Sequence, residues 1–255
     1  MAMNETKIKK GLLTVSFRQL APQAIVDLVK EAQLDCIEWG GDVHVPHGDI
    51  AAAEAAAAMT VEAGLEVAAY GSYYRIGVSE DDGLAFQSVL NSAIALGAPS
   101  IRVWAGGKGS AEADQEDRDK AVEDSVRIAD LAAPHDITIA YEWHSHSLTD
   151  TLESGLRLIQ DVDHSHVKTL WQPSPHHTVE ENLAELTAIS EYLVNLHVYH
   201  LVGEDRRPLE EGKEDWKKYF EVATAAPGEH SAMLEFVRDD SPEAFREDAE
   251  ILRSM

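Results

Sequence analysis

Residues 137–172 read ITIAYEWHSHSLTDTLESGLRLIQDVDHSHVKTLWQ and contain the pattern that decides the fold. An apolar run at Ile137–Glu142 is followed by a longer segment with helix signals, and then by a second apolar run at Val167–Gln172. Short strands that alternate with helices of about 10–15 residues are typical of βαβ units in a parallel sheet. The stretch therefore predicts one such unit.

The same alternation continues along the rest of the chain. Gly64 and Gly97 end two helical segments as natural C-terminal caps, and Pro242 stands in the first turn of the last segment. Besides the two runs above, strands are predicted at Leu12–Ser16, Cys36–Trp39, Leu65–Tyr70, Ser100–Trp104, Leu193–Tyr199 and Ala232–Phe236.

Eight strand–helix repeats in 255 residues match the number and length of a (β/α)8 barrel. The rival architecture is a doubly wound open sheet, which usually carries a glycine-rich phosphate loop after its first strand. Here the segment FRQLAP at residues 17–22 follows the first strand and contains no such loop. Because no domain boundary stands out, we predict an α/β protein that is a single (β/α)8 TIM barrel over residues 1–255.

The composition limits the classes of partner. The formal net charge is −25, and a surface this acidic repels phosphate backbones and anionic membranes. The acidic residues are dispersed, which favours solubility or adaptation to salt over an acidic tail. No apolar run approaches the roughly 18 residues that a membrane span needs. The N-terminal MAMNETKIKKG has no apolar signal core. We therefore expect a cytoplasmic protein that binds neither nucleic acid nor membranes.

The single cysteine, Cys36, excludes an internal disulfide and a cysteine-rich metal site. It lies in an apolar run, and we expect it to be a small core residue rather than a catalytic one.

Polar side chains follow four consecutive strands at the end where each strand stops. In a closed barrel the carboxyl ends of the strands converge, and catalytic groups come from these ends. Two carboxylates, an imidazole and an amide oxygen suit an oxygen-rich site for Mn²⁺, Mg²⁺ or Co²⁺ better than a thiolate zinc site. The four residues are Glu142, Gln172, His197 and Glu235.

Alternation along the strands predicts which neighbours share the interior. If Glu142 points inward, Tyr141 faces the helices. On the strands before it, Arg102, Trp104 and Glu38 are then expected to point inward. Because alternate strands share a side-chain layer, Glu38 and Arg102 are candidates for a buried ion pair.

Several short motifs together resemble one known family, the xylose isomerase-like barrels of the sugar phosphate isomerase/epimerase group. The motifs are IEWGGDVH at 37–44, RVWAG at 102–106, AYEWH at 140–144, NLHVYH at 195–200, RRPLEEG at 206–212 and LEF at 234–236. The resemblance covers essentially the whole chain in order, although each motif is short. It implies an enzyme of carbohydrate metabolism, an isomerase or epimerase acting on a small sugar or sugar phosphate.

The resemblance also implies roles for individual residues. Glu142, His197 and Glu235 correspond to three of the family's ligands for one divalent ion, with Zn²⁺ as a further candidate metal. Gln172 stands where the family has an aspartate. Glu142 and Glu235 would move a proton at the carbon next to the carbonyl. The residues expected to bind substrate are His176, Arg206, Trp104, His44 and His144.

The missing aspartate leaves three alternatives open. Gln172 binds the metal through its amide oxygen, or His176 or His200 replaces it, or the barrel binds no metal at all. The reaction is open as well, because fold does not fix function. A related dehydratase or a hydroxypyruvate-type isomerase is one alternative, and a non-catalytic sugar-binding barrel is another. A DNA endonuclease of the same superfamily is disfavoured by the acidic charge. A homo-oligomer is compatible with the sequence.

Overall fold

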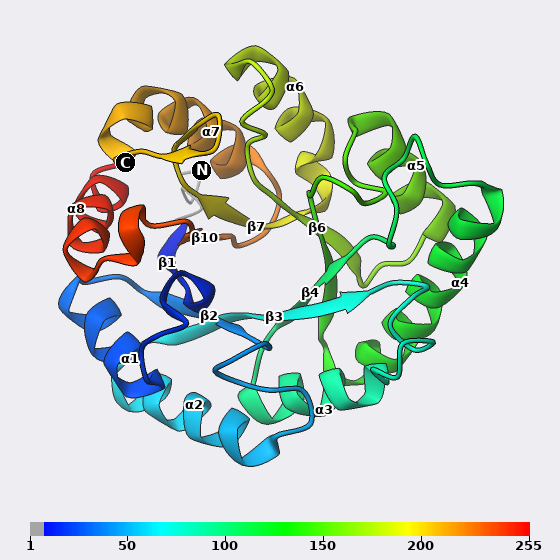
Figure 1. The fold of residues 1–255 in the computed structure, drawn as a ribbon, viewed down its shortest axis with the longest axis horizontal. Helices are drawn as coiled ribbons and strands as arrows, with labels where there is room; N and C mark the ends of the chain where they lie inside the picture. The colour runs from blue at the N-terminus through cyan, green and yellow to red at the C-terminus, as the bar shows by residue number, and fades with distance from the viewer. Residues whose placement is uncertain (1–7) are drawn as a thin grey trace, which may run out of the picture. The chain divides into compact units, whose positions relative to one another are not determined.

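The computed structural model describes residues 8–255 and contains a closed barrel of eight parallel strands (Figure 1). Around the barrel the strands follow the order β1-β10-β7-β6-β5-β4-β3-β2. This confirms the predicted α/β class and the (β/α)8 TIM barrel. The barrel strands are β1 (Lys9–Leu13), β2 (Cys36–Gly40), β3 (Glu66–Arg75), β4 (Ser100–Trp104), β5 (Thr138–Glu142), β6 (Val167–Trp171), β7 (Leu193–Val198) and β10 (Ser231–Leu234).

Eight α-helices within residues 8–255 alternate with these strands. Two of them begin with reciprocal capping boxes, Asp114 with Asp117 and Thr178 with Glu181, which satisfy backbone donors that the first turn leaves open. The helices are α1 (Pro22–Glu31), α2 (Ile50–Glu62), α3 (Phe86–Leu96), α4 (Gln115–Ala132), α5 (Leu152–Val162), α6 (Val179–Ile189), α7 (Lys213–Ala225) and α8 (Pro242–Arg253).

Short elements fill the connections between strands and helices. A small antiparallel hairpin of β8 (Leu201–Val202) and β9 (Asp205–Arg206) follows β7. The 3₁₀ helices are η1 (Thr14–Phe17), η2 (Ala133–His135), η3 (Ser190–Tyr192), η4 (Leu209–Gly212) and η5 (Arg238–Asp240). Most of these connections follow a strand end, where a barrel places its functional loops.

Two strands differ from the prediction by more than two residues at one end or both. The first strand was expected at Leu12–Ser16 but lies at Lys9–Leu13, and Thr14–Phe17 turns into η1. Two charged residues, Lys9 and Lys10, begin it, so the apolar run shows only its second half. The third strand continues past its predicted end at Tyr70 to Arg75, with a register shift against β4 between Gly71 and Arg75. Both errors have one source: apolar runs do not mark where backbone pairing starts or stops.

The described residues divide into two compact units. One comprises residues 8–38, 59–66 and 171–255, and the other comprises residues 39–58 and 67–170. In the first unit, Trp171, Trp216 and Tyr219 form an aromatic cluster between β6 and α7. In the second, the buried rings of Tyr74 and Phe86 pack edge to face at 5.3 Å. The prediction of one single domain stays a prediction.

Gly11 allows β1 to pack closely on β2. A Cβ atom at this position would lie 2.3 Å from the carbonyl oxygen of Cys36, so no larger residue fits without moving the backbone. Cys36 itself is fully buried, and burial raises the pKa of its thiol to about 12. It is therefore a buried core residue, as predicted.

Among residues 8–255, no helix combines the length and the apolar character that crossing a bilayer requires.

Candidate active site

Glu142 lies in a buried cluster with two side chains of the neighbouring strand β4. The Nη1 atom of Arg102 lies 2.6 Å from Oε2 of Glu142, and the indole Nε1 of Trp104 donates to the same oxygen. The charged side chains of Arg102 and Glu142 are 3% and 4% exposed. The three residues share one face of the sheet, as alternation predicted. Two donors on one oxygen stabilise the ionised carboxylate.

Aromatic rings surround this cluster. The guanidinium of Arg102 lies 5.0 Å from the ring centroid of Tyr73, and Tyr73 packs edge to face on Trp104. The half-buried ring of His144 lies 5.1 Å from that of Trp104. Two residues predicted to bind substrate, Trp104 and His144, thus lie beside Glu142. Sequence reasoning missed Tyr73, because it ended the third strand at Tyr70.

His197 lies between two carboxylates inside the first unit. Its Nε2 atom is 3.1 Å from Oε2 of Glu38, and its Nδ1 atom is 3.3 Å from Oε2 of Glu235. The side chains of His197 and Glu38 are fully buried, and that of Glu235 is 7% exposed. The backbone N–H of Glu235 donates to the carbonyl of Val198, which fixes Glu235 beside β7.

The two carboxylates control the charge of the imidazole. Burial alone lowers the pKa of His197, but the negative charges of Glu38 and Glu235 outweigh it and raise the pKa to about 10. The partnership of Glu38 with His197 was not foreseen, because the sequence pointed to Arg102 as the partner of Glu38. The signal that could have found it is the inward position of both side chains. A direct contact between Glu38 and Arg102 stays a prediction.

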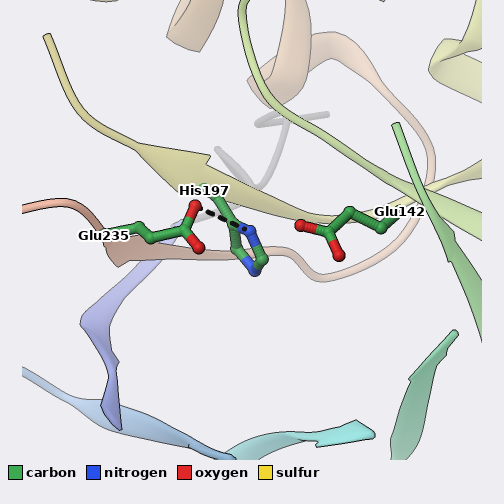
Figure 2. Close-up of side chains that lie close together, drawn as sticks. All are labelled: Glu142, His197 and Glu235. Carbon is green, nitrogen blue, oxygen red and sulfur yellow. Dashed lines mark ion pairs between the residues drawn. The ribbon is translucent and has the colours of Figure 1, made fainter. Parts of the chain in front are cut away.

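Glu142, His197 and Glu235 meet the geometric condition for a metal site. Each offers one ligand atom, and these atoms all lie within 4.8 Å of one another; all three residues are buried (Figure 2). Oε2 of Glu235 accepts no aligned hydrogen bond from any of residues 8–255, although it is buried. A buried oxygen in that state fits a ligand for a cation, because burying it unsatisfied is costly. Two carboxylates and an imidazole suit Mn²⁺, Mg²⁺, Co²⁺ or Zn²⁺.

Gln172 follows β6 directly and is 8% exposed. Its neighbour Trp171 donates its indole N–H to Glu185 of α6, so Trp171 faces the helices. By alternation Gln172 faces the opposite way, toward the interior. Whether its amide binds a metal stays a prediction.

Arg206 donates to the carbonyl oxygen of Val237, two residues after Glu235, and lines a small cavity. Its Nη1 atom is 2.6 Å from Oδ1 of Asp240, and its guanidinium lies 5.4 Å from the ring centroid of Phe236. The cavity measures about 130 Å³. Its lining residues are Val15, Ser16, Arg18, Gln19, Arg206, Phe236 and Asp240. The buried Oγ of Ser16 forms no hydrogen bond within residues 8–255.

Two of the histidines predicted to bind substrate lie in loops that follow β2 and β6. His44 is buried in the loop after β2, with its ring 6.2 Å from that of Trp39. His176 is exposed in the loop after β6, where its backbone N–H donates to Oγ of Ser174. The roles of both residues stay predictions.

The fold and the buried cluster agree with the family that the chain matches. The model of the family described as xylose isomerase-like TIM barrel matches residues 26–255. The chain therefore belongs to the xylose isomerase-like TIM-barrel family.

One relative and two solved structures are particularly similar. A 3-dehydroshikimate dehydratase of Bacillus anthracis is 30% identical over 168 residues, which are 63% of this chain and 60% of that protein. The crystal structure of a probable 3-DHS dehydratase of the same organism has a TM-score of 0.82 at 22% identity, covering 96% of this chain and 99% of the other. A 3-keto-D-glucoside 4-epimerase of E. coli has a TM-score of 0.75 at 19% identity, covering 98% and 100%. At these identities the two structures show the fold alone.

Proposed function

We propose that this chain is a divalent-metal-dependent dehydratase that removes water from a small hydroxylated oxo-acid of the 3-dehydroshikimate type. The observation that carries the proposal is the buried group of Glu142, His197 and Glu235, whose ligand atoms lie within 4.8 Å of one another. The 30% identity to a 3-dehydroshikimate dehydratase favours dehydration over the other reactions of this fold.

Glu142, His197 and Glu235 would hold the ion, with Gln172 as the fourth candidate ligand. When bound, a divalent cation polarises a carbonyl and stabilises the negative charge that develops on its oxygen. Glu38 would orient His197 from the side opposite Glu235, because a carboxylate on the second ring nitrogen fixes the tautomer and the ring plane.

The chain's own carboxylates would carry out the proton transfers. One glutamate removes the proton from the carbon next to the carbonyl, which gives an enolate. The hydroxyl group on the following carbon then leaves, taking a proton from the second glutamate, and departs as water. With a 3-dehydroshikimate, loss of one water and tautomerisation give a dihydroxybenzoate. The first step needs a carboxylate at a fixed distance from the carbon, and Arg102 and Trp104 fix Glu142 in this way.

The metal-dependent sugar epimerase or isomerase first expected from the sequence remains the second candidate. It begins with the same proton abstraction, and the enolate then receives a proton back instead of losing hydroxide. The group contains two glutamates, which favours this reaction, because one glutamate can remove a proton from one face of a carbon and the other can return it to the opposite face. Trp104 and His144 would form the substrate wall in either reaction, and Arg206 would bind an oxygen of the substrate.

The test separates the two reactions. The protein is treated with a chelator, reloaded with Mn²⁺ and incubated in D₂O with 3-dehydroshikimate or with a panel of ketoses. For the oxo-acid, we expect the ultraviolet absorbance of the aromatic product to rise only after reloading. For the ketoses, the dehydratase proposal expects neither epimer nor deuterium incorporation. Epimer formation with deuterium at the carbon next to the carbonyl would replace it by the second candidate.

Two variants then assign the proton transfers. Glu142→Gln and Glu235→Gln are each followed by product formation and by deuterium exchange of the substrate. The variant that lacks the base loses both signals, whereas the variant that lacks the acid keeps exchange and loses product. If both variants turn over as the unchanged protein does, the proposal of glutamate-mediated catalysis is wrong. A protein that binds no Mn²⁺ and converts nothing would support the non-catalytic alternative.

A further inference from the structure

A cavity of about 240 Å³ lies inside the second unit, at the ends of β3 and β4. Three basic side chains and one carboxylate line it, in a chain whose formal net charge is −25. Its lining residues are Arg75, Ile76, Gly77, Val78, Gly106, Gly107, Lys108, Ala113, Asp117, Lys120 and Leu148.

Arg75 is the basic residue of this cavity that has no carboxylate partner. Lys108 binds Asp117 at 2.8 Å, and Lys120 binds Glu116 at 2.8 Å, so each of these ammonium groups is already neutralised. The guanidinium of Arg75 makes no ion pair within residues 8–255. Its single described contact is with the ring of Trp104, whose centroid lies 5.0 Å away. Its N–H donors are therefore available to an acceptor, in the planar arrangement that matches a carboxylate.

The loop that carries Arg75 is held in place by buried and partly buried hydrogen bonds. Asp124 of α4, which is 9% exposed, accepts from the backbone N–H of Gly77 at 2.7 Å and from the hydroxyl of Tyr74 at 3.0 Å. The backbone N–H of Arg75 donates to Oγ of Ser79 at 2.7 Å. The loop is therefore fixed before any ligand arrives, which lowers the entropic cost of binding.

The opposite wall of the cavity is hydrogen-bonded to the backbone of Trp104. The backbone N–H groups of Ile76 and Gly106 both donate to the carbonyl oxygen of Trp104 at 3.0 Å. Gly106 has a φ of +89°, a conformation that glycine adopts without strain. Trp104 also donates its indole N–H to Glu142. Trp104 therefore contacts both the guanidinium of Arg75 and the carboxylate of Glu142.

We propose that this cavity is the subsite for the anionic group of the substrate, with Arg75 as the residue that binds it and Trp104 as the wall under the carbon skeleton. The assignment rests on the proposed function, because Arg75 supplies the positive charge that the carboxylate of an oxo-acid substrate needs. An anion approaching a chain of net charge −25 is repelled at long range, so its binding depends on a local cation without a carboxylate partner. The anionic group is an oxyanion, either a planar carboxylate or a tetrahedral phosphate.

The first experiment measures anion binding without turnover. Saturation-transfer NMR with benzoate and ³¹P line broadening with inorganic phosphate are recorded for the unchanged protein and for Arg75→Gln. We expect the unchanged protein to bind benzoate, and Arg75→Gln to lose at least tenfold in affinity. Arg246→Gln is the matched control, because it removes the same charge from the exposed surface of α8. Stronger binding of phosphate than of benzoate would assign the subsite to sugar phosphates rather than to oxo-acids.

The second experiment measures kinetics with 3-dehydroshikimate. Arg75→Gln should raise KM at least tenfold and change kcat less than threefold, and Arg75→Lys should recover part of the loss because it restores the charge without the planar donor pair. If neither KM nor benzoate binding changes in Arg75→Gln while the unchanged protein turns over, the subsite is wrong and the proposed function stands. If anion binding depends on Arg75 but no oxo-acid is converted, the subsite stands and the proposed function is wrong.

Discussion

Arg102 and Glu142 form a buried ion pair in which Nη1 and Oε2 lie 2.6 Å apart, and Trp104 donates to the same carboxylate oxygen. The cost of removing two charges from water is recovered only while both partners are present. Removing one partner is therefore destabilising, and the pair also fixes the orientation of Glu142.

Arg102→Met should be strongly destabilising, because it leaves the carboxylate of Glu142 buried beside a neutral side chain. We expect the free energy of unfolding to fall by about 3–5 kcal/mol, measured by urea denaturation of the chelator-treated protein. Arg157→Met is the control: Arg157 pairs with Asp161 on the surface of α5, and such pairs contribute about 0–1 kcal/mol. Equal losses for the two variants would mean that Glu142 is not held as an ion by Arg102.

Glu38→Gln should weaken metal binding without removing a metal ligand. Glu38 contacts Nε2 of His197, on the ring edge opposite Glu235. Carboxylates in this position typically contribute about 10–100-fold in metal affinity, and we expect a loss in that range when Mn²⁺ binding is titrated. Glu66→Gln, which removes an exposed partner of Lys9, should leave the affinity unchanged. An unchanged affinity for Glu38→Gln would show that Glu38 does not position His197.

Metal binding should release a proton from His197. In the metal-free protein the neighbouring carboxylates raise the pKa of His197 to about 10, so the ring is protonated at pH 8. A histidine binds a metal only in its neutral form. The apparent affinity should therefore fall about tenfold for each pH unit below 10. Calorimetric titration at pH 8 in buffers of different ionisation enthalpy counts the protons released on Mn²⁺ binding. A count of zero would contradict the role of His197 as a ligand.

Gln172→Asp tests whether position 172 faces the metal. A carboxylate at this position adds one negative charge to the ligand set, so Mn²⁺ affinity should rise if residue 172 is a ligand. Gln172→Leu should lower the Mn²⁺ affinity, because leucine has no oxygen that could bind the ion. Both variants are compared by equilibrium dialysis at one pH. If neither differs from the unchanged protein, Gln172 is a recognition residue or an interior cap, and another group completes the site.

The sequence predicted the parts of this molecule that depend on local pattern. The strand–helix repeat predicted the barrel, and alternation predicted that Arg102, Trp104 and Glu142 share a face. It did not predict which inward groups meet, because that depends on register and on side-chain length. Arg102 therefore was expected beside Glu38, whereas the described contacts join Arg102 to Glu142 and Glu38 to His197.

The ends of the strands were also poorly predicted from the sequence. The third strand continues five residues beyond Tyr70 because backbone pairing with β4 resumes after an irregularity at Gly71. Tyr73 and Arg75 therefore escaped notice, although both contact residues of the candidate site. The cytoplasmic location, the oligomeric state and the absence of nucleic-acid partners stay predictions.

The position of Trp104 gives the protein a built-in spectroscopic reporter. Its indole N–H donates to Glu142, whereas those of Trp171 and Trp216 donate to Glu185 and to the carbonyl oxygen of Tyr199. When a cation shares the charge of Glu142, the electrostatic field at this one indole changes and the fields at the buried indoles change less. Intrinsic fluorescence of Trp104 should therefore report the occupancy of the site in the unlabelled protein.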